Sequence, residues 1–587
     1  MGNKWYIYCK KGDFAAISKK FNISPMLARI LINRGLETDE DINGFLNAGL
    51  ESLHDPFLMK DMDKGVALVI KAIADGGRIR IIGDYDVDGI CASYIMKKYF
   101  DFFGASSDVR LPNRVFDGYG MNESMADDAH VDGISLIITC DNGVSSYDAV
   151  KRAEELGIEV IITDHHSIPE VLPPAQAIID AKQDDCNYPY KELCGAAVAY
   201  KFITAVNTKI FEQIGELLPA NIDRESVNNL FDELIQYVGM ATIADIVPLQ
   251  GENRIFAKEG IRRLRETNNP GLSALIDIKG IERSRLKAFH VGFVIGPCLN
   301  SAGRLKDAQI AFDLLDAEDR ETAFRLASGL SELNEERKGI TQCQIDTAQS
   351  MINKRVEKEK DLPAVLVIYL PEAHESVAGI VAGKLKDTYN RPAIVLTDSE
   401  EGLKGSGRSV DGYNMIDALQ RHSELFKKFG GHAKAAGFTL NCPPSELDSI
   451  LNAENILAGV DFEKKTWIDM QLPFNYITEE FIEEINLLEP YGFDNAKPLF
   501  AEKDVRLSGF KLLGKNSNVL KMTMVNALDD KLEGVIFGHG KSLEEMKNKL
   551  ESQAADNKLF SVIYHPVINE FKKFRYLQAI INEIRLT

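Results

Sequence analysis

The sequence lacks three features that would place it in other classes of protein. It has no apolar run close to the roughly 20 residues that a membrane-spanning helix needs. Its N-terminus, MGNKWYIYCKKGDF, has no apolar core of the kind found in signal peptides. Its 8 cysteines are scattered without CxxC pairs, which argues against a disulfide framework and against a zinc knuckle. We therefore expect a cytoplasmic protein with reduced thiols.

An excess of positive charge is also absent. The formal net charge is −20, which argues against a generally basic surface that binds nucleic acid without specificity. A single groove can still be basic on an acidic protein. Part of the negative charge can also belong to carboxylates that bind metal ions. The charge alone therefore does not exclude a nucleic-acid substrate.

The 587 residues are too many for one hydrophobic core, so the chain should form several domains. From residue 78 onward, short β-rich runs alternate with helical segments, which predicts an α/β fold built on a parallel sheet with helices on both faces. Near the C-terminus, five strand-like runs and one helix are typical of an OB-like β-barrel. The predicted domains are an N-terminal helical segment (1–75), a catalytic α/β domain (76–306), a long connecting helix (307–360), a smaller α/β domain (361–460) and an OB-fold-like nucleic-acid-binding domain (461–587).

Acidic residues and histidines follow three of the predicted strands. Asp84, Asp86 and Asp88 come after RIRIIG, Asp141 comes after SLIITC, and Asp164, His165 and His166 come after EVIIT. The carboxyl ends of parallel strands lie along one edge of a sheet, where ligands bind, so these side chains should converge. Asp245, at the end of an apolar helical run, is a further candidate.

Several carboxylates in one crevice repel one another unless cations offset their charge. Mixed Asp and His ligands suit Mn²⁺, and Mg²⁺ where carboxylates and water dominate. Two such ions about 4 Å apart can activate water for hydrolysis. Taken singly, an acidic DxDxD loop is often a turn, and an Asp after a strand is usually a helix cap. The joint occurrence after three strands favours a metal site.

These motifs resemble the DHH phosphoesterase superfamily through GDYDVDG, TCDNG and TDHHSIP. The second α/β segment resembles its DHHA1 partner domain through HESVAGIVAGKL, GSGRS and GGHAKAAGFTL. LPNRVFDGYG, GPCLNSAGRL and EPYGFDNAKPLF resemble one branch of that superfamily, the bacterial exonucleases that degrade single-stranded DNA from its 5′ end. The resemblance covers essentially the whole chain.

The resemblance implies a set of site residues and a pair of divalent ions, Mn²⁺ or Mg²⁺. The implied metal ligands are Asp84, Asp86, Asp88, Asp141, His165 and Asp245, and the catalytic set also includes Asp164 and His166. The implied phosphate-binding residues are Arg114, Arg304, Ser406, Arg408 and His432. Which of the first three aspartates contacts metal directly stays open.

In EFKKFRYL, aromatic and basic residues are interleaved near the C-terminus. Strand alternation places Phe571, Lys573 and Arg575 on one face, which suits stacking and backbone contacts with a single strand. The other interpretation is a hairpin with aromatic side chains in the core and solvated lysines. The sequence does not decide between them.

The resemblance implies a metal-dependent exonuclease that degrades single-stranded DNA in the 5′ to 3′ direction to mononucleotides, in DNA repair and recombination. One alternative is a phosphodiesterase of short oligonucleotides or cyclic dinucleotides, although those relatives generally lack the C-terminal barrel. Another is a scaffold that binds single strands without catalysis. By the same resemblance we expect a single-stranded-DNA-binding protein and a RecQ-type helicase as partners. The expected oligomeric state is a monomer.

Overall fold

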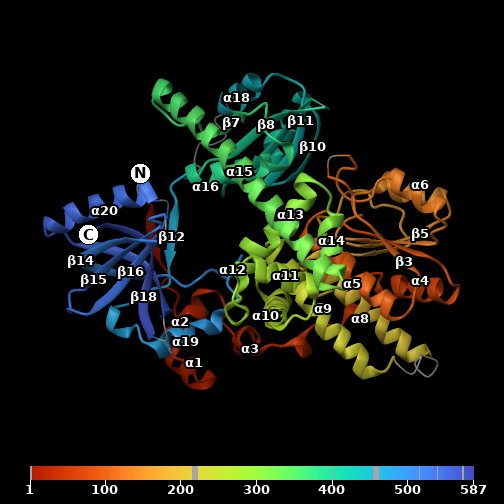
Figure 1. Ribbon diagram of the computed structural model, residues 1–587, viewed down its shortest axis with the longest axis horizontal. Coiled ribbons are helices and arrows are strands. Elements are labelled where there is room, and N and C mark those ends of the chain that lie inside the picture. Colours follow the sequence, from red (N-terminus) through yellow and green to blue (C-terminus); the bar gives the residue numbers. More distant parts are fainter. Residues whose placement is uncertain are drawn as a thin grey trace. The chain divides into compact units, whose positions relative to one another are not determined.

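The structure is a computed structural model (Figure 1) that describes residues 3–114, 116–214, 222–400, 402–453, 462–514, 516–538, 540–571 and 574–587. In this part of the chain, no helix combines the length and apolar character needed to cross a membrane. The chain divides into two compact units. One contains Met1–Ser52, Pro248–Arg254 and Lys464–Thr587, and the other contains Leu53–Val247 and Ile255–Glu463.

The larger unit is built around a parallel sheet, as the alternation of strands and helices predicted. Its strand order is β3 (Ser107–Arg110), β2 (Ile79–Ile82), β4 (Leu136–Cys140), β5 (Glu159–Thr163) and β6 (Ala177–Ile179). All residues of β2 and β4 are buried, which explains why these strands read as continuous apolar runs.

Helices cover both faces of this sheet. On one face, α6 (Glu123–Val131) and α7 (Tyr147–Glu155) contribute to a core cluster that includes Ile82 and Ile162. On the other face, α4 (Met62–Ala74) packs closely, because Gly65 lies against Ile161 of β5 and against α8 (Gly195–Ile214). The helix α5 (Val87–Phe102) packs against α8 on this side.

The remaining helices of the unit follow the sheet. They are α9 (Arg224–Ala244), α10 (Gly251–Arg265), α11 (Pro270–Ile278), α12 (Ala288–His290), the π-helix η5 (Val291–Ile295), α13 (Gly296–Leu305), α14 (Gln309–Asp316) and α15 (Arg320–Glu359). The sequence pattern predicted one helix from about residue 307, but the structure has two. Ala317 has an extended conformation that ends α14, and Asp319 then caps the first turn of α15.

A second, mixed sheet completes this unit. Its order is β10 (Phe426–His432), β11 (Ala435–Leu440), β9 (Gly402–Arg408), β8 (Ala393–Ser399) and β7 (Leu366–Tyr369). One face packs against α15 and α16 (Glu375–Tyr389). The other face packs against α17 (Met415–Gln420) and α18 (Pro444–Ala453). A smaller α/β domain of this kind is what the sequence predicted.

The smaller unit contains a sheet that closes on itself. Its strands are β13 (Met470–Gln471), β14 (Phe500–Leu513), β15 (Val519–Val525), β16 (Lys531–Phe537), β17 (Phe560–Phe571) and β18 (Phe574–Leu586), with α20 (Gly540–Ala555) between β16 and β17. Because β14 pairs with both β15 and β17, the strands β14-β15-β16-β18-β17 form a closed ring. Closure removes the exposed edges of these strands, as in an OB fold.

N-terminal residues contribute to the same unit. Side chains of α2 (Pro25–Asn33) join the core of the closed sheet, and α1 (Phe14–Phe21), α3 (Asp39–Asn47) and α19 (Glu479–Ile485) pack around it. A strand, β1 (Lys4–Ile7), precedes these helices and pairs in parallel with β12 (Lys465–Ile468). The sequence pattern predicted only helices in this segment, because a four-residue edge strand depends on a partner more than 450 residues away.

Close packing of α9 on α10 supplies a test of this core. A Cβ added to Gly239 would lie 2.7 Å from Gly260 Cα and 2.7 Å from Phe256 O. We expect Gly239→Ala to lower the free energy of unfolding by about 1–3 kcal/mol because the helices must separate. Gly329→Ala, in α15, meets nothing within 4 Å and should instead stabilise by about 0.5–1 kcal/mol. Urea unfolding followed by circular dichroism distinguishes the two; equal shifts would contradict the packing argument.

Candidate active site

The first three aspartates are positioned by the turn between β2 and α5. Asp84 follows the strand and is buried, and Asp86 caps α5 by accepting hydrogen bonds from the backbone N–H groups of Asp88 (2.9 Å) and Gly89 (3.3 Å). A Cβ on Gly89 would lie 2.4 Å from Asp84 N, so only glycine allows the strand end to approach the helix this closely. The GDYDVDG motif is therefore a strand-to-helix turn that holds its carboxylates at the end of the sheet.

Asp88 is oriented by the beginning of α8. Its Oδ2 accepts a hydrogen bond from Gly195 N (2.6 Å) and its Oδ1 accepts one from Ala196 N (2.7 Å). Backbone N–H groups at a helix N-terminus favour a negative charge. Gly195 is required here because a Cβ would lie 2.5 Å from Asp141 Cβ. The sequence analysis did not find this contact; its signal is the small-residue run CGAAVA at the start of an apolar helix.

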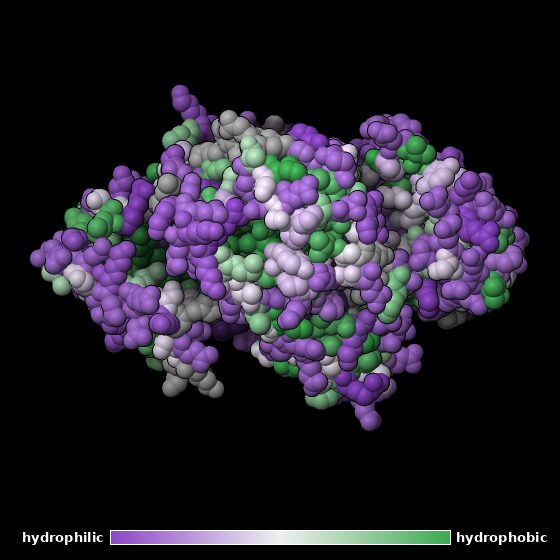
Figure 2. Space-filling view, turned by 90° about the horizontal axis from the view of Figure 1, so that it is seen from above, coloured by the Kyte–Doolittle hydropathy of each residue, from purple (hydrophilic) through white to green (hydrophobic). Residues whose placement is uncertain are grey.

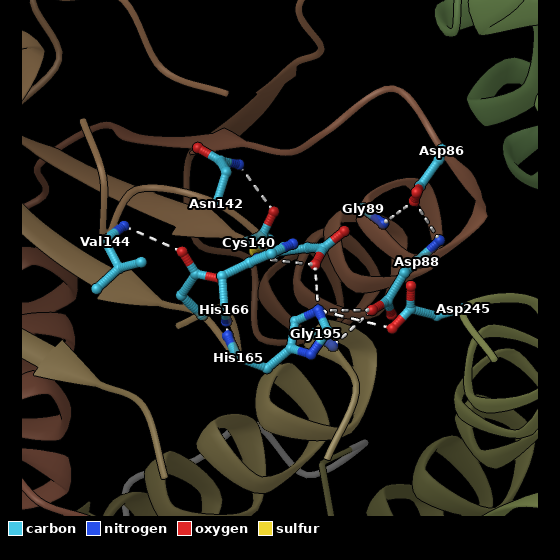
Figure 3. A network of polar contacts seen from close by, with 12 residues as sticks. Asp86, Asp88, Gly89, Cys140, Asn142, Val144, His165, His166, Gly195 and Asp245 are labelled. Atoms are coloured by element: carbon cyan, nitrogen blue, oxygen red, sulfur yellow. Dashed lines mark hydrogen bonds and ion pairs between the residues drawn. The ribbon is translucent and has the colours of Figure 1, made fainter. Parts of the chain in front are cut away.

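His165 lies among three carboxylates that come from different elements (Figure 3). Its Nε2 is 2.9 Å from Asp141 Oδ1, 3.6 Å from Asp88 Oδ2 and 3.7 Å from Asp245 Oδ2. Asp141 follows β4 with a left-handed backbone (φ 63°), and Asp245 follows the last residue of α9. The fold thus brings together residues that are up to about 160 positions apart in the sequence.

Asp164 orients the neighbouring histidine and has little capacity left for a metal ion. Its Oδ1 accepts hydrogen bonds from His165 N (2.7 Å) and His166 N (3.2 Å) and lies 2.7 Å from His166 Nδ1, while its Oδ2 accepts one from Val144 N (3.0 Å). The same imidazole is contacted by Tyr119, whose hydroxyl lies 3.1 Å from both His166 Nδ1 and His166 Nε2 and donates to Asp141 O (2.8 Å). Tyr119 belongs to the LPNRVFDGYG motif, but no feature of that motif predicted this contact.

Burial and mutual repulsion raise the pKa of the clustered carboxyl groups. Burial, with the charge of Asp86, raises the pKa of Asp84 well above its usual range and that of Asp88 to about 7. Burial, with the charge of Asp88, raises the pKa of Asp141 and of Asp245. Carboxylates in this arrangement need a compensating positive charge to stay ionised at neutral pH.

The pKa values of the two histidines are shifted in opposite directions. Burial, together with the charge of His166, lowers the pKa of His165 to about 3, so its imidazole is neutral and can act as a ligand. Burial would also lower the pKa of His166, but the hydrogen bond with Asp164 and the surrounding carboxylates raise it to about 9. Burial would raise the pKa of Asp164, but the hydrogen bond with His166 and the charges of both imidazoles outweigh this effect and lower it. His166 is therefore a cation held beside the cluster.

The donor set fits divalent metal ions. Three overlapping groups have ligand atoms within 4.8 Å of one another: Asp84, Asp86 and Asp141; Asp88, His165 and Asp245; and Asp141, His165 and His166. Asp84 Oδ1, Asp141 Oδ1 and His165 Nε2 are buried and have no hydrogen-bond partner among the described residues. Carboxylate oxygens together with the neutral imidazole of His165 suit Mn²⁺ or Mg²⁺.

Arginines lie close to Tyr85, the residue between Asp84 and Asp86. The guanidinium of Arg114 lies 4.8 Å from the centre of the Tyr85 ring, and Arg304 Nη1 donates to Ser376 O (2.8 Å). Burial and the charge of Arg114 lower the pKa of Arg304 to about 10 and also lower that of Arg408. Positive charges that lie this close together repel one another, and a bound anion would remove that repulsion. The arrangement is therefore suited to an anion such as phosphate.

A hollow of about 450 Å³ opens between the two sheets of this unit. Its lining residues from the first sheet's loops are Tyr85, Arg114, Gly118 and Tyr119, and those from the second sheet and α16 include Ser376, Lys404, Ser406 and Lys428. Arg408 lies just behind, since a Cβ on Gly379 would be 2.9 Å from both Arg408 Nη2 and Ser406 Oγ. His432 is exposed on β10 and does not line this hollow.

The predicted single-strand surface of the smaller unit is only partly described. Lys573 and the side chain of Phe571 lie outside the described residues. Arg575 contacts three carboxylates, at 2.5 Å from Glu479, 2.8 Å from Glu483 and 3.6 Å from Glu570. The exposed aromatic side chains of this hairpin are Phe574 (65%) and Tyr576 (47%). The sequence-based alternatives for this segment therefore stay open.

Three family models match the chain in order. The DHH family N-terminal domain matches residues 78–223, the DHHA1 domain matches 363–456 and the RecJ OB domain matches 468–583. The single-stranded-DNA-specific exonuclease RecJ of Escherichia coli is 34% identical over 96% of this chain and 96% of its own length. That of Bacillus subtilis is 35% identical over 97% of this chain and 69% of its own length.

A solved structure has the same fold over nearly the whole chain. The crystal structure of RecJ in complex with Mn²⁺ from Thermus thermophilus matches with a TM-score of 0.79 and 25% identity, and the alignment covers 99% of this chain and 79% of that one. A crystal structure of RecJ in complex with Mg²⁺ from the same organism matches with a TM-score of 0.74 at 24% identity.

The raised pKa values predict how stability depends on pH and metal. The folded pKa of Asp88, about 7, exceeds its ordinary value of about 3.9. Its stabilising contribution in metal-free protein is therefore present below about pH 4 and is lost as the pH rises to 7. Metal ions bind the ionised form, so Mn²⁺ should raise Tm more at pH 8 than at pH 5.5. The rise at pH 8 should be about 3 °C for each bound ion at roughly 100 times Kd.

A pair of variants tests whether this effect comes from the cluster. Asp141→Asn should lose the Mn²⁺-dependent rise in Tm. Asp101→Asn removes an exposed carboxylate that pairs with Lys97 at the end of α5 and should keep the rise. Differential scanning calorimetry at both pH values measures the Mn²⁺-dependent rise in Tm. An equal rise in the two variants would mean that the metal binds outside this cluster.

Proposed function

Because this chain belongs to the RecJ family of single-stranded-DNA-specific exonucleases, we propose that it hydrolyses single-stranded DNA from the 5′ end and releases mononucleotides. One observation supports the proposal above all: carboxylates and an imidazole from four separate elements converge near a hollow whose lining includes Arg114, Lys404 and Lys428. We also propose that this exonuclease activity serves DNA repair and recombination.

In the proposed mechanism the acidic cluster holds two divalent ions, Mn²⁺ or Mg²⁺. The ligands would be Asp84, Asp86, Asp88, Asp141, His165 and Asp245. Bound ions supply an activated water and polarise the phosphoryl oxygens. Gly195 and Ala196 orient Asp88 and partly offset its burial through their N–H groups, and Asp164 keeps His166 charged. The positive charge of His166 would stabilise the negative charge that develops on the phosphate oxygens.

The hollow gives a reason for cleavage from an end. Arg114, Ser406 and Arg408 would bind the terminal 5′ phosphate, with Arg304 close to the phosphate that is cleaved. A hollow of about 450 Å³ is the size of a small-molecule site, so it accepts about one nucleotide and excludes a duplex. His432 stays a predicted phosphate contact from the neighbouring hairpin.

Further proposals concern the compartment, the oligomeric state and the protein partners of the enzyme. We propose that it acts in the cytoplasm as a monomer, and that a single-stranded-DNA-binding protein and a RecQ-type helicase supply its substrate. Resemblance to the family supports these proposals. Size-exclusion chromatography with light scattering tests the monomer directly.

Digestion of a 5′-phosphorylated strand of about 40 nucleotides tests the activity and its direction. With Mn²⁺ present, a 5′ label should appear first as a mononucleotide, while a 3′ label stays on progressively shorter strands. Chelator, or Asp141→Asn, should reduce the rate by at least about 10³-fold because the ions are lost. Turnover of di- or trinucleotides alone would instead indicate the short-oligonucleotide phosphodiesterase, and binding without cleavage would indicate the scaffold.

A second experiment tests the phosphate hollow. Arg408→Ala should raise KM for a 5′-phosphorylated strand about 10- to 100-fold, since a hydrogen bond to a charged group is lost. The same variant should also reduce the ratio of kcat/KM for a 5′-phosphorylated strand to kcat/KM for a 5′-hydroxyl strand. Lys386→Ala, which removes another cation near α16 that pairs with Asp387, is the matched control. An unchanged preference would mean that the terminal phosphate is bound elsewhere.

A further inference from the structure

Two lysines of the second sheet line the hollow but have no role in the proposed mechanism. They are Lys404 of β9 and Lys428 of β10. Hydrophilic residues cover most of the face drawn in Figure 2, so an accessible lysine is by itself ordinary. These two differ from a solvated surface lysine because they line the same hollow as Ser406, which would bind the terminal phosphate.

The strand register places these lysines in one row with two threonines. Thr397 of β8 lies opposite Lys404, Lys404 lies opposite Thr439 of β11, and Thr439 lies opposite Lys428. Directly opposite residues of antiparallel strands point to the same face, with Cβ atoms about 5 Å apart. All four residues line the hollow. They therefore form a continuous polar row across four strands.

This row lies beside the proposed position of the terminal phosphate. Arg408, Ser406 and Lys404 occupy alternate positions of β9, so their side chains point to one face of the sheet. Alternate residues of a strand are about 6.6 Å apart. A phosphate held by Ser406 and Arg408 would therefore have Lys404 as its next neighbour along the strand.

The beginning of α16 holds the row in place. Thr397 Oγ1 donates a hydrogen bond to Ala373 O, and Glu375 Oε2 pairs with Lys404 Nζ at 2.9 Å. Glu375 offsets part of the charge of Lys404. The described residues that line the hollow nevertheless carry three positive charges and one negative charge, in a chain whose net charge is −20. The hollow is thus locally suited to an anion.

Thr439 has a hydroxyl group that no other part of the described chain uses. The residue is 3% exposed and lines the hollow, and its hydroxyl makes no hydrogen bond among the described residues. Buried hydroxyl groups normally have a hydrogen-bond partner. A phosphate oxygen would accept a hydrogen bond from this hydroxyl, and lysine ammonium groups bind phosphate as point charges. The row therefore offers the groups that a phosphate needs.

We infer that Lys404, Lys428 and Thr439 form a second phosphate subsite beside the one for the terminal 5′ phosphate. The inference rests on the proposed function, which places the phosphate next to the sugar at Ser406 and Arg408. The ligand of the second subsite is a phosphate group joined to that first one. It belongs either to a strand that ends in a 5′-triphosphate or to free pyrophosphate.

A strand with a 5′-triphosphate is then a substrate. Water adds to the phosphorus between the first and second nucleotides, the bond from that phosphorus to the 3′ oxygen of the first nucleotide breaks, and this oxygen takes a proton. The first nucleotide leaves as a deoxynucleoside triphosphate. The shortened strand begins with a single 5′ phosphate, so the following rounds release monophosphates.

Binding to Asp141→Asn, which retains the strand uncut, tests the subsite. A 5′-triphosphorylated strand should bind roughly 10- to 150-fold more tightly than a 5′-phosphorylated one, because a hydrogen bond to a charged group is added. Lys404→Met/Lys428→Met should bring this ratio close to 1. Lys427→Met, which removes a neighbouring lysine that does not line the hollow, should keep it. Glu375→Gln should increase the ratio, since Lys404 no longer shares its charge with a carboxylate.

Competition without added metal separates the two sources of the second phosphate. Pyrophosphate that occupies both subsites should displace a 5′-phosphorylated strand at a lower concentration than inorganic phosphate does. Tighter binding of the triphosphorylated strand without this advantage of pyrophosphate would assign the subsite to strand ends, and the reverse would assign it to free pyrophosphate. Equal results in both comparisons would overturn the inference. A ratio that survives in Lys404→Met/Lys428→Met would also overturn it.

The products of the native enzyme with Mn²⁺ give an independent test. A label in the first nucleotide of a 5′-triphosphorylated strand should be released as a nucleoside triphosphate, which chromatography separates from the monophosphate. A label that stays on this strand while a 5′-phosphorylated strand is degraded would contradict a second subsite. The binding ratio stays decisive even if the chain proves to hydrolyse no DNA, because it needs no cleavage.

Discussion

Repulsion among buried carboxylates is the constraint on which the rest of the larger unit depends. Asp84, Asp88, Asp141 and Asp245 are placed close together and away from water, where each raises the pKa of another. Such a cluster is stable only if N–H groups and cations compensate it. The N-terminus of α8 supplies N–H groups to Asp88, and His166 supplies a positive charge. Bound divalent ions would supply the remaining positive charge, so we expect the cluster to be more stable with metal than without it.

The same electrostatic logic, with the sign reversed, applies to the hollow. Burial and the charge of Arg114 lower the pKa of Arg304 and of Arg408, so an anion bound here would be favoured. The long helix α15 packs against both α13, which carries Arg304, and α16, which packs on the second sheet. It therefore connects the arginine near the hollow with the second sheet. A phosphodiester chain suits this arrangement because its phosphates can contact the cations while the ions act on the adjacent bond.

Much of the site could be predicted because its residues sit in short motifs that follow strands. GDYDVDG, TCDNG and TDHH each combine an apolar strand with the residue that its end presents, and the carboxyl ends of parallel strands meet by geometry. The roles of Tyr119 and of the Gly195–Ala196 backbone were not predicted. Neither leaves a compositional signal, since a tyrosine and two small residues are ordinary until folding brings them to His166 and Asp88.

The α/β class, the parallel sheet, the closed C-terminal sheet and the set of candidate ligands could all be predicted from the sequence, because periodicity and strand-end chemistry are local properties. The sequence pattern did not predict that Asp164 orients His166, that α8 holds Asp88 or that β1 pairs with β12. The last two are contacts between segments more than 100 residues apart, and the first depends on how the turn after β5 folds. Their energies depend on burial and distance, and a linear pattern carries neither.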